Sequence, residues 1–287
     1  MTKPALSSTV TVLWTGALAV LMTALVSGIW AGLLGANLAT SPTIPWAAVA
    51  MGLVIWALWA YLGGRFPPRG THDARRVLLR SAPLPAPVLA WAIFAGVLGV
   101  VALAGFWIVL HRLVATHGNP QPDFSRLPKA TVVISLAMAA ISGGVSEEAG
   151  FRGYFQGALE RRGLGAFAIL VAGLVMSPIH ALTQGFVWPN LVFYLLVDGL
   201  LGALAYVTGS IRPGVVVHCI GLFIFFALVW PNDAHRQLIS VTGTDTAFWL
   251  SLGQTVVCGV FGAAAFAQLL RATKGRAAAG GAAAALA

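Results

Sequence analysis

The chain has 287 residues, of which 59% are hydrophobic and only 9% are charged. Soluble domains usually carry about a quarter charged residues, so this composition excludes an ordinary water-soluble fold. The mean hydropathy of +0.87 predicts a polytopic membrane protein instead. Basic loops that face anionic membrane lipid explain the formal net charge of +9, and nucleic-acid binding is then an unnecessary hypothesis.

The N-terminal part contains no charged residue between Lys3 and Arg65, which leaves room for two spans of roughly 20 residues each. Pro42 and Pro45 mark the turn between them. The first apolar run is longer than a secretory signal, so we expect it to remain as a helix. Further apolar stretches follow at about 84–110, 130–158, 164–185, 190–209, 213–230 and 247–270. Because these runs are continuous rather than alternating, they predict an all-α transmembrane bundle of about eight helices and exclude a β-barrel.

Basic residues predict the orientation, because Lys and Arg are retained in cytoplasmic loops. One face collects twelve of them: Lys3, Arg65, Arg69, Arg75, Arg76, Arg80, Arg161, Arg162, Arg212, Arg271, Lys274 and Arg276. The other face has four: Arg112, Arg126, Lys129 and Arg236. We therefore expect both termini in the cytoplasm and the protein in a cytoplasmic membrane of the bacterial kind.

The chain shows no internal repeat and no second domain. We expect three N-terminal transmembrane helices and the basic loop 65–81 in residues 1–129, a four-helix core in 130–230, and a last span in 231–276. Residues 277–287 are rich in Ala and Gly and are expected to be disordered. Cys219 and Cys258 fall inside predicted spans without ligand spacing, so they are interpreted as apolar packing residues.

Four charged residues and two histidines remain inside the predicted spans: Glu147, Glu148, Arg152, Asp198, His180 and His218. A charge at mid-membrane costs about 2.5–3.5 kcal/mol on insertion scales, so such residues usually mark function or a necessary internal partner. Glu148 and Arg152 are four residues apart and can neutralise each other on one helix face. Glu147 points about 100° away and stays free to meet neighbouring helices. Small residues allow those helices to approach closely: Gly143, Gly144, Ala149, Gly150 and Gly153.

The nearby glutamates favour a catalytic interpretation of the two histidines. His180 follows Pro178, which is expected to kink its helix, and His218 lies early in a later span. A lone histidine in a bundle is more often a hydrogen-bonded core residue than a catalyst. An unpaired glutamate with two histidines, however, is the set of groups that activates water, with or without a metal. Asp198 is interpreted as a supporting residue that orients a histidine or pairs with Arg152.

The segment from Glu147 to Gly153 reads Glu-Glu-Ala-Gly-Phe-Arg-Gly and resembles the E-E-x-x-F-R-G motif of the CPBP family. This family contains the type 2 CAAX prenyl proteases and the bacteriocin-processing, ABI-like membrane proteins. The segments Gly199–Gly202 and Thr208–Pro213, followed by His218, are similar to the final motif block of the family. The likeness spans about residues 130 to 230, and it implies that this core is the catalytic part of an intramembrane endopeptidase.

The resemblance implies a role for each residue. Glu147 matches the general base that activates water, His180 its hydrogen-bond partner that positions the water, and His218 a donor to the developing oxyanion. The supporting residues are expected to be Glu148, Arg152 and Asp198. The cofactor stays open between none and a divalent metal such as zinc on Glu147, His180 and His218. Such groups can ligate zinc, but they are dispersed over three helices and lack the H-E-x-x-H spacing.

Two positions depart from the family pattern. Met176 stands where an aromatic residue usually precedes the second-motif histidine, and it is interpreted as a packing change. Leu222 stands where members often carry Asn, and an apolar side chain cannot donate to an oxyanion. The leading prediction is therefore an endopeptidase that cleaves a membrane-anchored or prenylated peptide or protein. The alternatives are a non-catalytic immunity or scaffold protein, which Leu222 favours, and a proton-coupled transporter, which the lack of repeats disfavours.

Overall fold

A computed structural model describes residues 8–115, 124 and 127–285, and these residues form helices and connecting loops without a strand. The apolar helices are α1 (Ser8–Thr40), α2 (Trp46–Leu62), α4 (Ala86–Leu113), α5 (Lys129–Glu147), α7 (Phe167–Gln184), α8 (Trp188–Thr208), α9 (Arg212–Ile224) and α11 (Thr246–Ala285). By length and composition, six helical stretches in the described part of the chain can cross a membrane, while α2 and α7 are shorter apolar helices. The prediction of an all-α membrane bundle is confirmed.

Helix α5 ends at Glu147, the first glutamate of the motif, but the helical backbone does not end there. The backbone continues through the π-helical segment η2 (Glu148–Gln156), a short α6 (Gly157–Leu159) and a second π-helical segment, η3 (Glu160–Leu164). The sequence predicted an uninterrupted ordinary helix here. π-helical turns are rare in proteins, and those that occur are often found at functional sites. The π-helical backbone of the motif is therefore consistent with a functional role for this segment.

The remaining short elements lie in the connections. They are η1 (Arg69–Thr71), α3 (His72–Leu79), η4 (Phe225–Val229), η5 (Trp230–His235) and α10 (Ile239–Thr242). The segments η4 and η5 extend α9 without a break, so the helix that begins at Arg212 continues for several more turns.

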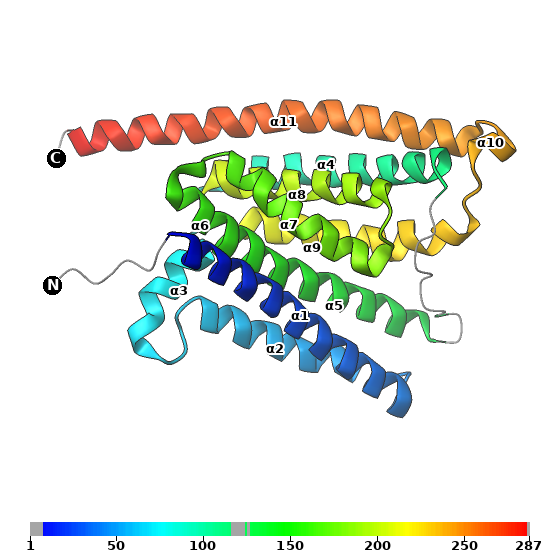
Figure 1. Cartoon of the computed structure of the whole chain (residues 1–287), viewed down its shortest axis with the longest axis horizontal. Helices are drawn as coiled ribbons and strands as arrows, with labels where there is room; N and C mark the ends of the chain where they lie inside the picture. Colours follow the sequence, from blue (N-terminus) through cyan, green and yellow to red (C-terminus); the bar gives the residue numbers. More distant parts are fainter. Residues whose placement is uncertain (1–7, 116–123, 125–126, 286–287) are drawn as a thin grey trace.

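The helices form layers, with α1 and α2 on one side, α4 and α11 on the other, and the remaining apolar helices between them (Figure 1). The largest contacts join α11 to α4, α7 to α8, α5 to α9 and α1 to η2. Helix α1 begins and α11 ends at the same end of the bundle, the end at which α3 also lies (Figure 1). This arrangement agrees with the expectation that both termini lie on the same side of the membrane. Lys3 and Arg126, which enter the orientation argument, lie outside the described residues.

The C-terminal tail corrects one expectation. Residues 277–287 were expected to be disordered, but α11 continues as a helix to Ala285. Alanine has the highest helix propensity of all residues. Adding residues to an existing helix also avoids the cost of nucleation. The long transmembrane part of α11 therefore extends into the alanine-rich segment.

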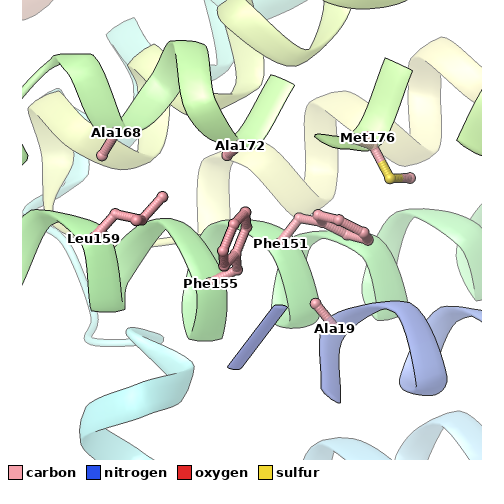
Figure 2. Packing of buried hydrophobic residues seen from close by; sticks show 7 residues of the cluster. All are labelled: Ala19, Phe151, Phe155, Leu159, Ala168, Ala172 and Met176. Carbon is pink, nitrogen blue, oxygen red and sulfur yellow. The ribbon is translucent and has the colours of Figure 1, made fainter. Parts of the chain in front are cut away.

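Two phenylalanines of the motif helix build the packing between α1 and α7. Phe151 and Phe155 lie between Ala19 of α1 and small residues of α7, as Figure 2 shows. Met176 belongs to the same cluster and is buried, which fits its interpretation as a packing change. A methyl group at Gly150 would lie 3.0 Å from the Ala19 Cα, so a larger residue would push the two helices slightly apart. In lipid, such close packing is a main source of helix association.

Candidate active site

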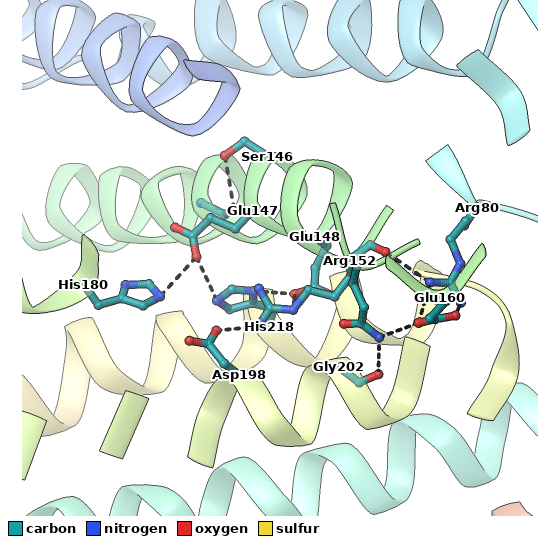
Figure 3. Close-up of polar contacts among 12 residues, drawn as sticks. Arg80, Ser146, Glu147, Glu148, Arg152, Glu160, His180, Asp198, Gly202 and His218 are labelled. Atoms are coloured by element: carbon teal, nitrogen blue, oxygen red, sulfur yellow. Dashed lines mark hydrogen bonds and ion pairs between the residues drawn. The ribbon is translucent and has the colours of Figure 1, made fainter. Parts of the chain in front are cut away.

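Four of the six predicted site residues come from four neighbouring segments that meet inside the bundle. Glu147 ends α5, Glu148 begins η2, His180 lies on α7 and His218 on α9 (Figure 3). Glu148 is fully buried, and Glu147 and His218 are also buried. The side chain of His180 is 16% exposed. Residues that are up to 71 positions apart in the sequence therefore share one small volume.

The Glu147 carboxylate lies between the two imidazole rings. Its Oε2 atom is 3.7 Å from His180 Nε2 and 3.5 Å from His218 Nε2. Ordinary N–H···O hydrogen bonds are about 2.7–3.2 Å long, so these contacts are somewhat longer than direct bonds. All three groups can therefore act on one small molecule bound beside them.

His218 is oriented by the second glutamate of the motif. Its Nδ1 atom lies 3.0 Å from Glu148 Oε1, within hydrogen-bond distance, and its Nε2 atom faces Glu147. A carboxylate acceptor favours a proton on Nδ1 and fixes the plane of the ring. The expectation for Glu148 named only its pairing with Arg152, so the contact with His218 is an addition from the structure.

Arg152 lies between two carboxylates. Its Nε atom is 3.4 Å from Glu148 Oε1, and its Nη2 atom is 2.5 Å from Asp198 Oδ1. The pairing expected at the i, i+4 spacing is therefore present. Of the two roles considered for Asp198, the structure has the pairing with Arg152. Among the described residues, several buried atoms of this cluster lack a hydrogen-bond partner: Glu147 Oε2, Glu148 Oε2, Asp198 Oδ2 and Arg152 Nη1. Such atoms are rare because they lose solvation without compensation.

A cavity of about 410 Å³ opens beside this cluster. Glu147, His180 and His218 line it, together with mainly apolar side chains of α1, α4, α7, α8 and α9. Leu222 is one of these apolar residues. Tyr194 also lines the cavity and stacks on His180, with ring centroids 4.5 Å apart and planes 21° apart, which fixes the orientation of the imidazole. The polar cluster thus meets a space suited to an apolar ligand.

Sequence reasoning missed a polar row that continues the motif. Gln156 Nε2 donates to Glu160 Oε1 at 2.8 Å and to the Gly202 carbonyl at 2.9 Å. Glu148, Arg152, Gln156 and Glu160 recur every four residues, and this spacing was a signal available in the sequence. In an α-helix such a row drifts by about 40° per step, and the wider π-helical turns reduce that drift. Tyr194, in contrast, carries no comparable signal.

The side-chain arrangement bears on whether the site could hold a metal ion. Within residues 8–115, 124 and 127–285, no group of three or more His, Cys, Asp or Glu side chains is arranged to hold a metal ion. Zinc sites require ligand atoms at about 2.0–2.3 Å from a common centre. No chemical step is therefore assigned to a metal, and metal dependence stays a prediction for experiment.

These observations define a class of protein: a polytopic α-helical membrane protein with a buried carboxylate–imidazole cluster beside an apolar cavity. Residues 129–224, about a third of the chain, match the family model described as Type II CAAX prenyl endopeptidase Rce1-like. This segment is therefore similar to that family, in agreement with the resemblance of the motifs, and it includes all six predicted site residues. No curated protein and no solved structure matches the chain.

Proposed function

We propose that this protein is an intramembrane endopeptidase that hydrolyses a peptide bond in a membrane-anchored or prenylated substrate. The observation that carries the proposal is the position of the Glu147 carboxylate, between two imidazole Nε2 atoms and on the wall of an apolar cavity. The family match supports a protease at the level of the family. The glutamate mechanism and the substrate class are our inference from the geometry.

In the first step, Glu147 accepts a proton from a water molecule held beside it. The water oxygen forms a bond to the carbonyl carbon of the substrate, and the carbonyl π electrons move to its oxygen. His180, held in plane by its stack on Tyr194, positions the water. The product of this step is a tetrahedral intermediate with a negatively charged oxygen.

His218 is suited to stabilise that oxygen. With Nδ1–H donated to Glu148, a doubly protonated imidazole presents Nε2–H toward the reacting atoms. A donor aimed at the developing oxyanion is usually among the largest contributions to acyl-transfer catalysis. In the second step the C–N bond breaks, and the protonated Glu147 gives its proton to the leaving amine. A carboxylic acid and an amine result, and Glu147 returns to its initial form.

The cavity supports an apolar substrate. Its lining is mainly aliphatic and aromatic, and the polar groups named above lie on one part of its wall. A peptide that carries a lipid chain or a transmembrane anchor can place its apolar part in this space and its scissile carbonyl near Glu147. We therefore assign membrane-associated peptides and proteins as the substrate class.

The test is cleavage of a panel of membrane-anchored and prenylated peptides by the purified protein, with products identified by mass spectrometry. Replacing Glu147 with Gln removes the base with little change in volume and is expected to lower the rate by about 10²–10⁴-fold. Products that form at the wild-type rate in Glu147→Gln would refute the proposed base. Adding a chelator to the wild type tests metal dependence separately.

A second candidate is a non-catalytic membrane protein of the same fold, and Leu222 is the observation that favours it. Its side chain lines the cavity and offers no hydrogen-bond donor. The variant Leu222→Asn distinguishes the two functions. An endopeptidase is expected to show cleavage in the wild type and equal or faster cleavage in Leu222→Asn. Cleavage that appears only in the variant would favour the non-catalytic function for the natural chain.

A further inference from the structure

Arg80 has an unusual backbone conformation at the end of α3. Its φ of 54° lies in the left-handed region, and it is the sole non-glycine residue with a positive φ in the part of the chain that the structure describes. Glycine is preferred at such helix ends because a Cβ atom is strained there. An arginine in this conformation is therefore a reason to look at the contacts that its side chain makes.

Both terminal nitrogens of the Arg80 guanidinium group make hydrogen bonds. Nη1 donates to Glu160 Oε1 at 3.0 Å and to the carbonyl oxygen of Arg152 at 3.3 Å. Nη2 lies 3.0 Å from Glu160 Oε2 and donates to the Ala205 carbonyl at 3.0 Å. The side chain is only 11% exposed, so this is a largely buried pair with bidentate geometry (Figure 3). The sequence had assigned Arg80 only to the basic face of the membrane protein.

These bonds reach the π-helical segment that carries the motif. The Arg152 carbonyl belongs to η2, and the Arg152 guanidinium contacts Glu148, which in turn contacts His218. The contact between α3 and η2 is tight, since a methyl group at Gly153 would lie 3.0 Å from the Leu79 carbonyl oxygen. Arg80 therefore holds the backbone at the residue whose side chain supports the Glu148–His218 pair.

Residues 80–82 also bind the start of α9, the helix that carries His218. The Arg80 carbonyl accepts a hydrogen bond from Ile211 N at 3.0 Å. The next carbonyls continue this connection: Ser81 O accepts from Arg212 Nε at 2.8 Å, and Ala82 O accepts from Ser210 Oγ at 2.8 Å. One short stretch of chain thus fixes both elements whose relative position sets the distance between Glu148 and His218.

We propose that Arg80 is a positioning residue of the candidate site: its guanidinium group holds η2 while its backbone carbonyl holds the start of α9, so that Glu148 and His218 stay paired. The expected effect of Arg80 on the cleavage rate rests on the proposed function, whereas its expected effect on the stability of η2 does not. Because Arg80 lines no part of the described cavity, its loss is expected to affect the chemical step more than substrate binding.

The test compares the wild type with Arg80→Ala, Arg80→Lys and the control Arg76→Ala in detergent micelles or nanodiscs. Arg76 lies on α3, the short helix that ends just before Arg80; it is 68% exposed and contacts Asp73 at 3.9 Å. Hydrogen–deuterium exchange of residues 148–156 reports on η2, and peptide cleavage gives kcat and KM. Arg80→Ala is expected to speed exchange of η2 about tenfold and to lower kcat about tenfold, equivalent to about 1.4 kcal/mol, with KM within about twofold. Arg80→Lys should fall between, since an ammonium lacks the bidentate geometry.

Exchange of residues 148–156 in Arg80→Ala that equals that of Arg76→Ala would overturn the proposal, as would an unchanged kcat with a raised KM. If Arg80→Ala does not fold, Arg80→Lys and Glu160→Gln replace it, because both weaken the bidentate pair without opening a large cavity. If the wild type cleaves no peptide, the proposed function fails, and exchange in η2 alone then decides the role of Arg80.

Discussion

Two buried polar clusters in this protein contain similar residues but are built differently. The site cluster consists of Glu147, Glu148, Arg152, Asp198, His180 and His218. A second cluster consists of Trp107, His111, Asp233 and Arg236, where the end of α4 meets η5. Each combines a carboxylate, an arginine and a histidine inside an apolar bundle, where ionisable groups usually mark function.

The second cluster satisfies its hydrogen-bonding groups. Trp107 Nε1 donates to both oxygens of Asp233, at 3.2 and 3.0 Å, and Arg236 Nε lies 2.5 Å from Asp233 Oδ1. His111 Nδ1 lies 3.0 Å from the Trp107 carbonyl, and its ring stacks on Trp107. Within the described residues, none of these four side chains appears among those with an unpaired buried polar atom.

The site cluster differs because several of its buried polar atoms lack a hydrogen-bond partner, and one of them, Glu147 Oε2, belongs to a residue that lines the cavity. A satisfied polar network rigidifies a fold, whereas an incompletely satisfied one keeps bonding capacity for a ligand at a cost in stability. Residue types alone therefore do not separate a structural cluster from a candidate active site. The two clusters do differ in how completely their buried polar atoms are hydrogen-bonded, and the following predictions test this difference.

The largest effect is expected from Arg152→Ala in the site cluster. This change leaves Glu148 and Asp198 buried without their cation, and breaking a buried ion pair in this way costs about 3–5 kcal/mol. The free energy of unfolding in mixed micelles should fall by that amount. A loss below about 1 kcal/mol would show that the guanidinium does not neutralise the two carboxylates.

A smaller effect is expected from Asp233→Asn in the second cluster. An asparagine keeps an acceptor for Trp107 but loses the charge that pairs with Arg236, so stability should fall by about 1–3 kcal/mol. The rate of peptide cleavage by the folded variant should stay within about twofold of the wild type. Loss of cleavage in a variant of normal stability would contradict a purely structural role for this cluster.

The smallest effect is expected at Asp245, which precedes α11. Its carboxylate accepts hydrogen bonds from Arg112 at 3.2 and 3.1 Å and from Phe248 N at 2.8 Å. The hydrogen bonds from Arg112 lower the pKa of Asp245 below its ordinary value. A lowered pKa stabilises the fold at neutral pH, and this contribution is lost as pH falls through the folded pKa.

Replacing Asp245 with Asn keeps a good helix cap and removes only the charge. The melting temperature of Asp245→Asn should therefore lie slightly below that of the wild type at pH 7, and the difference should shrink toward pH 3. Asp73→Asn is the matched control, because Asp73 is 96% exposed and contacts Arg76 only at 3.9 Å. A difference that grows as the pH falls would contradict the assigned hydrogen bonds.

The sequence by itself determined the membrane class and the eight apolar helices, because a continuous apolar run of sufficient length has few other stable conformations in lipid. It also pointed to the six residues that meet in the site, since a charge within a span is costly and needs a reason. The i, i+4 pairing of Glu148 with Arg152 followed from helix geometry alone.

Tertiary structure decided what local patterns do not contain. Asp198 pairs with Arg152 across helices, and Glu148 also holds His218, because packing sets which distant side chains meet. The helical tail up to Ala285 and the π-helical turns of η2 also differ from the expected structure. Arg80 shows the difference most clearly. Its charge predicted only a side of the membrane, whereas its bonds to three separate segments depend on how those segments pack together.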